Sequence, residues 1–165
     1  MWDPWGSHLP ALIACASATD GPILEVGVGY YSTPILHALC QGSGRRLMSV
    51  DEDLDFAENF KSTYARSWHE FAYSPDYAVL ADLAKEQWSV VFIDNGKSPP
   101  GARRGADAAL FARSATFVVV HDHDLIETGP DVDRLARPLF PHSFVHSRYP
   151  NATIVMGNAP IPEIP

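Results

Sequence analysis

The stretch Ile23–Thr33 constrains the fold of this chain more than any other. It reads Ile-Leu-Glu-Val-Gly-Val-Gly-Tyr-Tyr-Ser-Thr, a short apolar run followed by two glycines one residue apart and, further on, by Ser-Thr. This order predicts a buried strand that runs into a tight loop and then into a helix. Pro34 suits the first helical position, with Ser32 or Thr33 as the cap.

The two glycines and a nearby acid indicate which ligand the loop could hold. Gly27 and Gly29 are expected to allow positive φ angles and a close approach of a ligand to the backbone. A dinucleotide fingerprint has a third glycine, but here Ser32 stands at that position and Glu25 lies at the strand end. A carboxylate repels a pyrophosphate and attracts an ammonium group. The loop is therefore expected to bind a nucleoside that carries a positive charge and no phosphates.

Strand patterns alternate with helical patterns along the chain. Strands are predicted at 23–26, 46–50, 69–73, 88–94 and 116–120, and two last runs, 143–149 and 152–156, read as a hairpin. Helices are predicted at 7–18, 34–40, 54–67, 75–85, 105–114 and 131–139. Ser7 is the candidate cap of the first helix and Asp53 that of the third. This alternation predicts an α/β domain with a mostly parallel sheet.

An acid lies at or just beyond the carboxyl end of every strand in the alternating part of the chain. These acids are Glu25, Asp51, Asp76, Asp94 and Asp122. In open α/β sheets the ligand lies beyond the carboxyl ends of the strands, so the acids are expected to surround one site. Asp51 follows Gly29 by 22 residues, close to the offset of about 20 residues expected of a ribose-binding acid.

The strand–acid–Gly-x-Gly loop resembles motif I of the class I S-adenosylmethionine-dependent methyltransferases. The closing hairpin resembles the end of their seven-stranded sheet, whose final strand inserts antiparallel. The resemblance implies a Rossmann-like, mostly parallel seven-stranded sheet with helices on both faces and a C-terminal antiparallel hairpin. It covers residues 1–158 as a single domain, followed by the Pro-rich tail 159–165, which is expected to be loose.

The resemblance also implies which residues bind S-adenosylmethionine. The methionine end would be held by Glu25, Gly27, Gly29, Ser32 and Thr33. The ribose would be held by Asp51, with Glu52 as its neighbour, and the adenine by Ser74 or Asp76. Asp94 would contact the cofactor at its acceptor end. For Ser74 and Asp76, an ordinary helix start is an equal interpretation. Trp2 and Trp5 could line the same pocket or simply pack the N-terminal helix.

Two arrangements could activate a methyl acceptor. The first resembles the metal-dependent catechol-type O-methyltransferases: Asp94, Asp122 and His123 would hold a divalent ion such as Mg²⁺, with Lys97 as the base. His123 stands where that pattern has an asparagine. The second needs no metal: His121 or His123 would act as the base, because imidazole titrates near neutral pH.

Two adjacent arginines complete the second arrangement. Arg103 and Arg104 would bind an acidic group of the acceptor, although a solvated loop is an equal interpretation of this pair.

Composition narrows the function classes. The chain has 165 residues and a formal net charge of −8, with no large basic cluster, which disfavours a nucleic-acid substrate. No segment reaches the length of a membrane span, so a cytoplasmic protein is expected.

The sequence thus favours methylation of a small molecule, more on oxygen than on nitrogen or carbon. The alternatives are a methyltransferase-like binding or assembly module without catalysis, and an aminopropyl transferase on the same fold. The short chain leaves little material for a lid, so the pocket is either open or completed by a second subunit of a homo-oligomer.

Overall fold

The computed structural model describes residues 4–96, 101 and 103–165 of the chain. Its strands form one seven-stranded sheet in the order β3-β2-β1-β4-β5-β7-β6. The strands are β1 (Ile23–Val26), β2 (Leu47–Asp51), β3 (His69–Tyr73), β4 (Trp88–Ile93), β5 (Ala115–Val120), β6 (His142–His146) and β7 (Thr153–Gly157). β1 to β5 pair in parallel, whereas β7 pairs antiparallel with both β5 and β6. The predicted fold class is confirmed.

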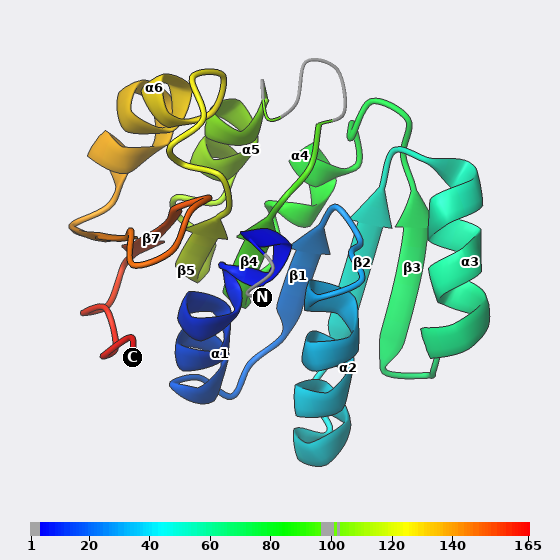
Figure 1. Cartoon of the computed structure of the whole chain (residues 1–165). Helices are drawn as coiled ribbons and strands as arrows, with labels where there is room; N and C mark the ends of the chain where they lie inside the picture. Colours follow the sequence, from blue (N-terminus) through cyan, green and yellow to red (C-terminus); the bar gives the residue numbers. More distant parts are fainter. Residues whose placement is uncertain (1–3, 97–100, 102) are drawn as a thin grey trace.

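Helices cover both faces of the sheet (Figure 1). One face carries α1 (Leu9–Ser17), α2 (Ser32–Ser43) and α3 (Leu54–Tyr64), the last of which packs on β2 and β3. The other face carries α4 (Leu80–Leu83), α5 (Arg104–Leu110), α6 (Gly129–Asp131), the π-helical turn η2 (Val132–Ala136) and the 3₁₀ turn η3 (Arg137–Leu139). A further 3₁₀ turn, η1 (Pro4–Gly6), precedes α1.

The β-branched strands form the core because side chains from both of their faces are buried. β1 is buried at every position, and so are the last four residues of β4 and of β5. Side chains that alternate along these strands divide into two clusters, one under α1 and α2 and the other under α4, α5 and η2. Burial on both faces is what a parallel sheet between two helical layers requires.

Several boundaries differ from the sequence-based prediction. α2 begins at Ser32, two residues before Pro34, and its N-cap residue Tyr31 makes no side-chain cap. α1 begins at Leu9 without a side-chain cap, because the Ser7 hydroxyl hydrogen-bonds elsewhere. Asp53 does cap α3, accepting a hydrogen bond from the Phe56 amide at 2.9 Å.

The Pro-rich tail packs on the domain rather than hanging free. Ala159, Ile161 and Ile164 lie against the core cluster under α1 and α2. Their apolar side chains alternate with the prolines and cover part of the sheet near its β7 side. Among the described residues, no helix is long and apolar enough to cross a membrane.

Candidate functional site

The glycine loop joins β1 to α2 and passes close to the end of β4. Gly27 has a φ of +92°, and a Cβ added to it would lie 2.5 Å from the Asp94 carbonyl oxygen. No other residue fits here without shifting backbone. Gly29 differs from the expectation, because its φ is not in the left-handed region. Its small size keeps it clear of the Ser32 hydroxyl, which lies 3.1 Å from the position of a Cβ.

Glu25 lies beneath this loop and not in an open pocket. The side chain is fully buried and accepts hydrogen bonds from Thr33 Oγ1 at 2.9 Å and Ser49 Oγ at 2.6 Å. Thr33 Oγ1 in turn accepts from the Gly29 amide at 3.0 Å. Burial raises the pKa of Glu25 to about 7, against the opposing effect of these hydroxyl donors. Glu25 therefore ties β1, β2 and α2 together, instead of meeting the ammonium group of a ligand as predicted.

A chain of hydrogen bonds continues from Glu25 toward α2. Ser49 Oγ lies 3.0 Å from His69 Nε2, and His69 Nδ1 lies 2.9 Å from His37 Nδ1. Burial, and then the proximity of His37, lowers the pKa of His69 to about 3. His69 is thus neutral at physiological pH. Because Ser49 Oγ donates to Glu25, it accepts the single proton of His69 from Nε2, and His69 Nδ1 accepts from His37 Nδ1.

Asp51 holds the glycine loop through its carboxylate. Its oxygens accept the Val28 amide at 2.9 Å and the Asp53 amide at 2.8 Å. The residue is 4% exposed. Glu52, its predicted neighbour at the ribose, is half-buried at the same strand end. Asp51 therefore positions the loop, and Glu52 has the greater solvent access of the two acids.

A cavity of about 420 Å³ opens over the glycine loop at the carboxyl edge of the sheet. Its lining combines aromatic side chains, the loop backbone and three polar side chains: Trp5, His8, Val28, Gly29, Tyr30, Tyr31, Ser32, Phe56 and Asp94. Gly29, Ser32 and Asp94 were predicted to bind the cofactor. Trp5 is 65% exposed and Tyr30 71% exposed, so the rim presents aromatic surface that a planar ligand could cover.

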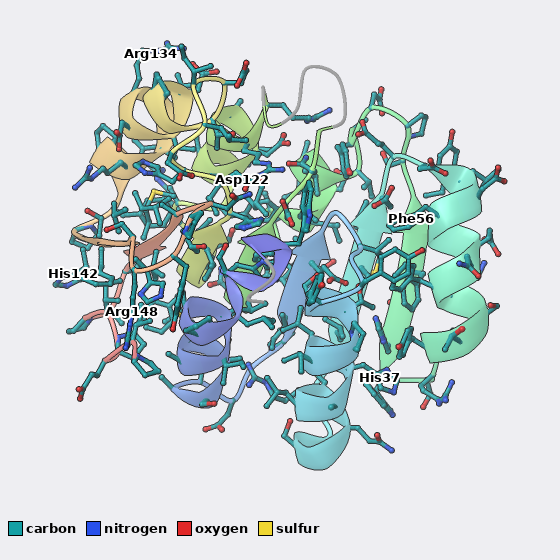
Figure 2. All side chains as sticks on the ribbon, viewed as in Figure 1. His37, Phe56, Asp122, Arg134, His142 and Arg148 are labelled. Atoms are coloured by element: carbon teal, nitrogen blue, oxygen red, sulfur yellow. The ribbon has the colours of Figure 1, made fainter. Side chains whose placement is uncertain are left out.

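The elements around the cavity come from distant parts of the sequence. η1 lies over the upper ends of β1 and β4 (Figure 1), and Trp5 belongs to this turn. Figure 2 shows Phe56 on α3 and Asp122 near the end of β5, on opposite sides of those two strand ends. Phe56 contacts Tyr30 edge-on, with ring centroids 5.6 Å apart. The N-terminal turn and α3 thus form opposite walls. Trp2 lies outside the described residues.

The predicted adenine loop does not line this cavity. Ser74 is buried, and its amide donates to the Asp51 carbonyl at 2.9 Å. Asp76 Oδ1 accepts the Ala78 amide at 3.0 Å, as at an ordinary turn. Both residues lie in a turn ahead of α4, which begins only at Leu80, so the structure has no helix start at this position.

Arg103 joins this loop to α5 instead of pointing toward an acceptor. Its guanidinium donates to both carboxylate oxygens of Asp107, at 2.6 and 3.0 Å, and to the Asp76 carbonyl at 2.6 Å. It also lies over the Tyr77 ring, 4.8 Å from the centroid. Asp107, and then the other neighbours, raise the pKa of Arg103 despite its partial burial.

Arg104 lies between two of the acids that were predicted to bind a metal. Its guanidinium contacts Asp94 Oδ1 at 2.8 Å and Asp122 Oδ2 at 2.9 Å. It also donates to the carbonyls of Asn95 and His121. Its side chain is 5% exposed. The guanidinium thus provides the positive charge that the two carboxylates need.

His123, the third predicted metal ligand, points to a different partner. Its Nε2 lies 3.2 Å from Asp133 Oδ1. The residues Asp94, Asp122 and His123 therefore do not fit a common metal ion, because Arg104 bridges the first two and the third faces Asp133. Lys97, the predicted base, lies outside the described residues.

His121 lies behind the cavity wall with a histidine that sequence reasoning missed. His121 Nδ1 is 3.2 Å from Asp94 Oδ2, and its Nε2 is 2.8 Å from Ser7 Oγ. The His8 ring packs edge-on against His121, with centroids 4.6 Å apart. Burial favours the neutral acid form of Asp94, but His121 and Arg104 hold its pKa below the ordinary value. Only the position of His8, one residue before an apolar helix, hinted at a role.

The electrostatics of the cavity favour a cationic ligand. Asp94 is the charged group among the lining residues, and its side chain is 26% exposed. Burial, and then the nearby His121, lowers the pKa of His8 to about 3, so this ring is neutral. Among the described lining residues there is no lysine or arginine. A sulfonium or ammonium group fits this environment better than a phosphate.

Comparisons with solved structures identify the fold. Human methyltransferase-like protein 13 in complex with S-adenosylhomocysteine superposes with a TM-score of 0.63 and 15% identity, over 92% of this chain and 78% of that one. The Podospora anserina methyltransferase PaMTH1, also bound to S-adenosylhomocysteine, has a TM-score of 0.66 and 10% identity, over 95% and 80%. This chain has the class I methyltransferase fold. No family model and no curated protein matches its sequence.

The same fold also occurs in neighbours of a second activity. A probable spermidine synthase from Corynebacterium glutamicum has a TM-score of 0.66 and 12% identity, over 96% of this chain. The chain spans 65% of that protein. Identities this low establish shared architecture and leave substrate and activity to the chemistry of the site.

Proposed function

We propose that the protein is an S-adenosylmethionine-dependent methyltransferase that acts on a small molecule. The observation that carries the proposal is the cavity over the Gly27–Gly29 loop, with its aromatic rim and its partly exposed Asp94 carboxylate, in a class I methyltransferase fold. Its volume suits a nucleoside-sized ligand.

The cofactor is proposed to lie between the glycine loop and the aromatic walls. The backbone of Val28 and Gly29 would approach the methionine part, because Gly27 brings the loop against the end of β4. Phe56 and Tyr30 offer ring faces to the adenine. Glu52, at the end of β2, is the acid with access to the ribose hydroxyls.

The acceptor is proposed to bind at the His8 and Asp94 side of the cavity. The Asp94 carboxylate, whose side chain is 26% exposed, presents a hydrogen-bond acceptor to the cavity, which suits a hydroxyl group. Methyl transfer forms an O–CH₃ bond and breaks the S–CH₃ bond, whose electrons stay on sulfur, and the hydroxyl proton passes to the Asp94 carboxylate. The buried Arg104 holds the Asp94 carboxylate in place for this contact. Oxygen is therefore the favoured acceptor atom.

Calorimetric titration with S-adenosylmethionine and S-adenosylhomocysteine tests the cofactor site. We expect binding by the wild type and a loss of about 5- to 150-fold in affinity for Phe56→Ala, since stacking of a base on an aromatic ring contributes about 1–3 kcal/mol. Phe144→Ala is the matched control, because Phe144 is 45% exposed on β6 and lies outside the cavity. Absence of heat and of thermal stabilisation with either ligand at millimolar concentration contradicts the proposal.

Aminopropyl transfer is the second candidate, favoured by the spermidine synthase neighbours and by the anionic cavity. The described lining residues include no lysine or arginine that could pair with the carboxylate of S-adenosylmethionine. The cofactor of aminopropyl transfer, decarboxylated S-adenosylmethionine, lacks that carboxylate. Tighter binding of the decarboxylated form than of S-adenosylmethionine in the same titration would favour this candidate. A binding module without catalysis would retain affinity but turn over no acceptor.

A further inference from the structure

Three side chains that can bind a metal ion converge beside the cavity, and no hydrogen bond links any two of them. His8, Asp94 and His121 each offer one nitrogen or oxygen atom, and these three atoms lie within 4.8 Å of one another. They come from the residue before α1, the end of β4 and the end of β5. The convergence therefore exists only in the folded chain.

His8 is buried without any hydrogen-bond partner among the described residues. The residue is 2% exposed, and both of its ring nitrogens are sequestered and unpaired. An unpaired buried polar group costs about 1–3 kcal/mol. Nothing in the packing explains this cost, since Phe92 and His121 contact the ring through aromatic surfaces. A ligand atom bound to the ring would supply the missing partner.

The contact between His121 and Ser7 determines which ring nitrogen of His121 carries the proton in the neutral form. Ser7 Oγ donates to the Asn151 carbonyl at 2.7 Å, so at 2.8 Å it accepts from His121 Nε2. In the neutral ring this arrangement leaves a lone pair on Nδ1. Nδ1 lies 3.2 Å from Asp94 Oδ2, yet it is not aligned in a hydrogen bond. Two lone pairs that face each other across this distance repel unless a cation lies near them.

The side chains around the three atoms carry a net negative charge that a cation would balance. Asp94 and Asp122 carry two negative charges, and Arg104 between them carries one positive charge. Arg104 holds Asp94 through Oδ1, so Oδ2 remains on the side of the histidines. Ser7 and Arg104 thus orient the donor atoms in the way that supporting residues orient metal ligands.

We propose that His8, Asp94 and His121 bind a divalent transition-metal ion, with Zn²⁺ preferred. Two imidazoles and one carboxylate are the ligand set of catalytic zinc sites, which keep a further position open. Bonds of about 2.0–2.2 Å keep such ligands roughly 3–4 Å apart, so a small rotation of a ring closes the site. Because His8 and Asp94 line the cavity, the ion has an entry path and its open position faces the acceptor side. This metal-site proposal does not depend on the proposed methyltransferase activity.

Metal titration of the tag-free, chelator-treated chain tests the site. We expect one Zn²⁺ per chain by calorimetry, a visible Co²⁺ band typical of four-coordination, and X-ray absorption that shows two imidazole ligands. Mg²⁺ should not compete, because it prefers oxygen ligands. His8→Gln and His121→Gln should each lower Zn²⁺ affinity by about 100-fold or more. Ser7→Ala should lower it by the 10- to 100-fold typical of a supporting residue.

His146→Gln is the matched control, because His146 is also buried with an unpaired Nε2 but lies outside the cluster. It should bind Zn²⁺ like the wild type, and thermal unfolding should show that every variant is folded. Absence of Zn²⁺ binding by the wild type overturns the proposal, and so does binding that survives both His8→Gln and His121→Gln. If those variants fail to fold, the wild-type X-ray absorption decides the question: fewer than two imidazoles contradicts the site.

Discussion

Replacement of Arg104 by alanine is expected to lower the free energy of unfolding by about 3–5 kcal/mol, the cost of breaking a buried ion pair. The substitution leaves Asp94 and Asp122 without their shared guanidinium. It also leaves the carbonyls of Asn95 and His121 without a donor. Arg104→Lys should recover only part of the loss, because an ammonium cannot span both carboxylates as the planar fork does. Urea unfolding curves with matched slopes provide the measurement.

Arg134→Ala is the control for this prediction. Arg134 pairs with Asp131 at 2.8 Å, but its side chain is 68% exposed and lies on the outer surface of the molecule (Figure 2). Exposed pairs of this kind contribute less than about 1 kcal/mol. Equal losses for Arg104→Ala and Arg134→Ala would show that the buried pairing does not stabilise the fold.

Glu25→Gln is expected to remove a pH-dependent cost of about 3 kcal/mol. Burial raises the pKa of Glu25 from 4.5 to about 7 in the folded chain, and each unit of difference is worth about 1.4 kcal/mol. Between these two values the folded chain keeps a proton that the unfolded chain releases, so rising pH destabilises the fold. The cost is fully present above pH 7 and absent below about pH 4.5.

The measurement compares the unfolding free energies of wild type and Glu25→Gln from pH 4.5 to 8. The difference between them should move in favour of the variant by about 3 kcal/mol as pH rises. The comparison is needed because the pKa of His69 is lowered to about 3. Titration of His69 therefore makes the fold more stable as pH rises from about 3 to 6.5, which opposes the effect of Glu25. Glu58→Gln, on the exposed side of α3, is the control. Parallel curves for wild type and Glu25→Gln would refute the prediction.

Most of the fold could be predicted from local patterns. Runs such as Val90–Ile93 and Val118–Val120 are β-branched and aromatic enough to require burial on both faces, and the structure buries them. The helix predicted at 75–85 is shortened to α4, and the one predicted at 131–139 is divided among α6, η2 and η3, because helical turns on a layered sheet are set by packing more than by propensity. The glycine loop was correctly located, although only Gly27 needs a positive φ.

The candidate site was predicted less completely, since the sequence shows which acids end a strand but not where their carboxylates point. Glu25 and Asp51 lie at neighbouring strand ends, yet both hold the glycine loop, whereas Asp94 reaches the cavity. Arg103 and Arg104 are adjacent in the chain and satisfy different acids, Asp107 for the first and the pair Asp94 and Asp122 for the second.

The sequence by itself determined the layered α/β architecture, the loop that bends under Gly27 and the edge of the sheet where the site lies. These follow from side-chain periodicity and backbone freedom, which are local properties. Only the tertiary structure decided that the N-terminal turn closes the site. Ser7 bonds to His121 across 114 residues, and His8 reaches Asp94 by the same packing of α1 on β4 and β5. Contacts of this range depend on how whole elements dock, which no local pattern encodes.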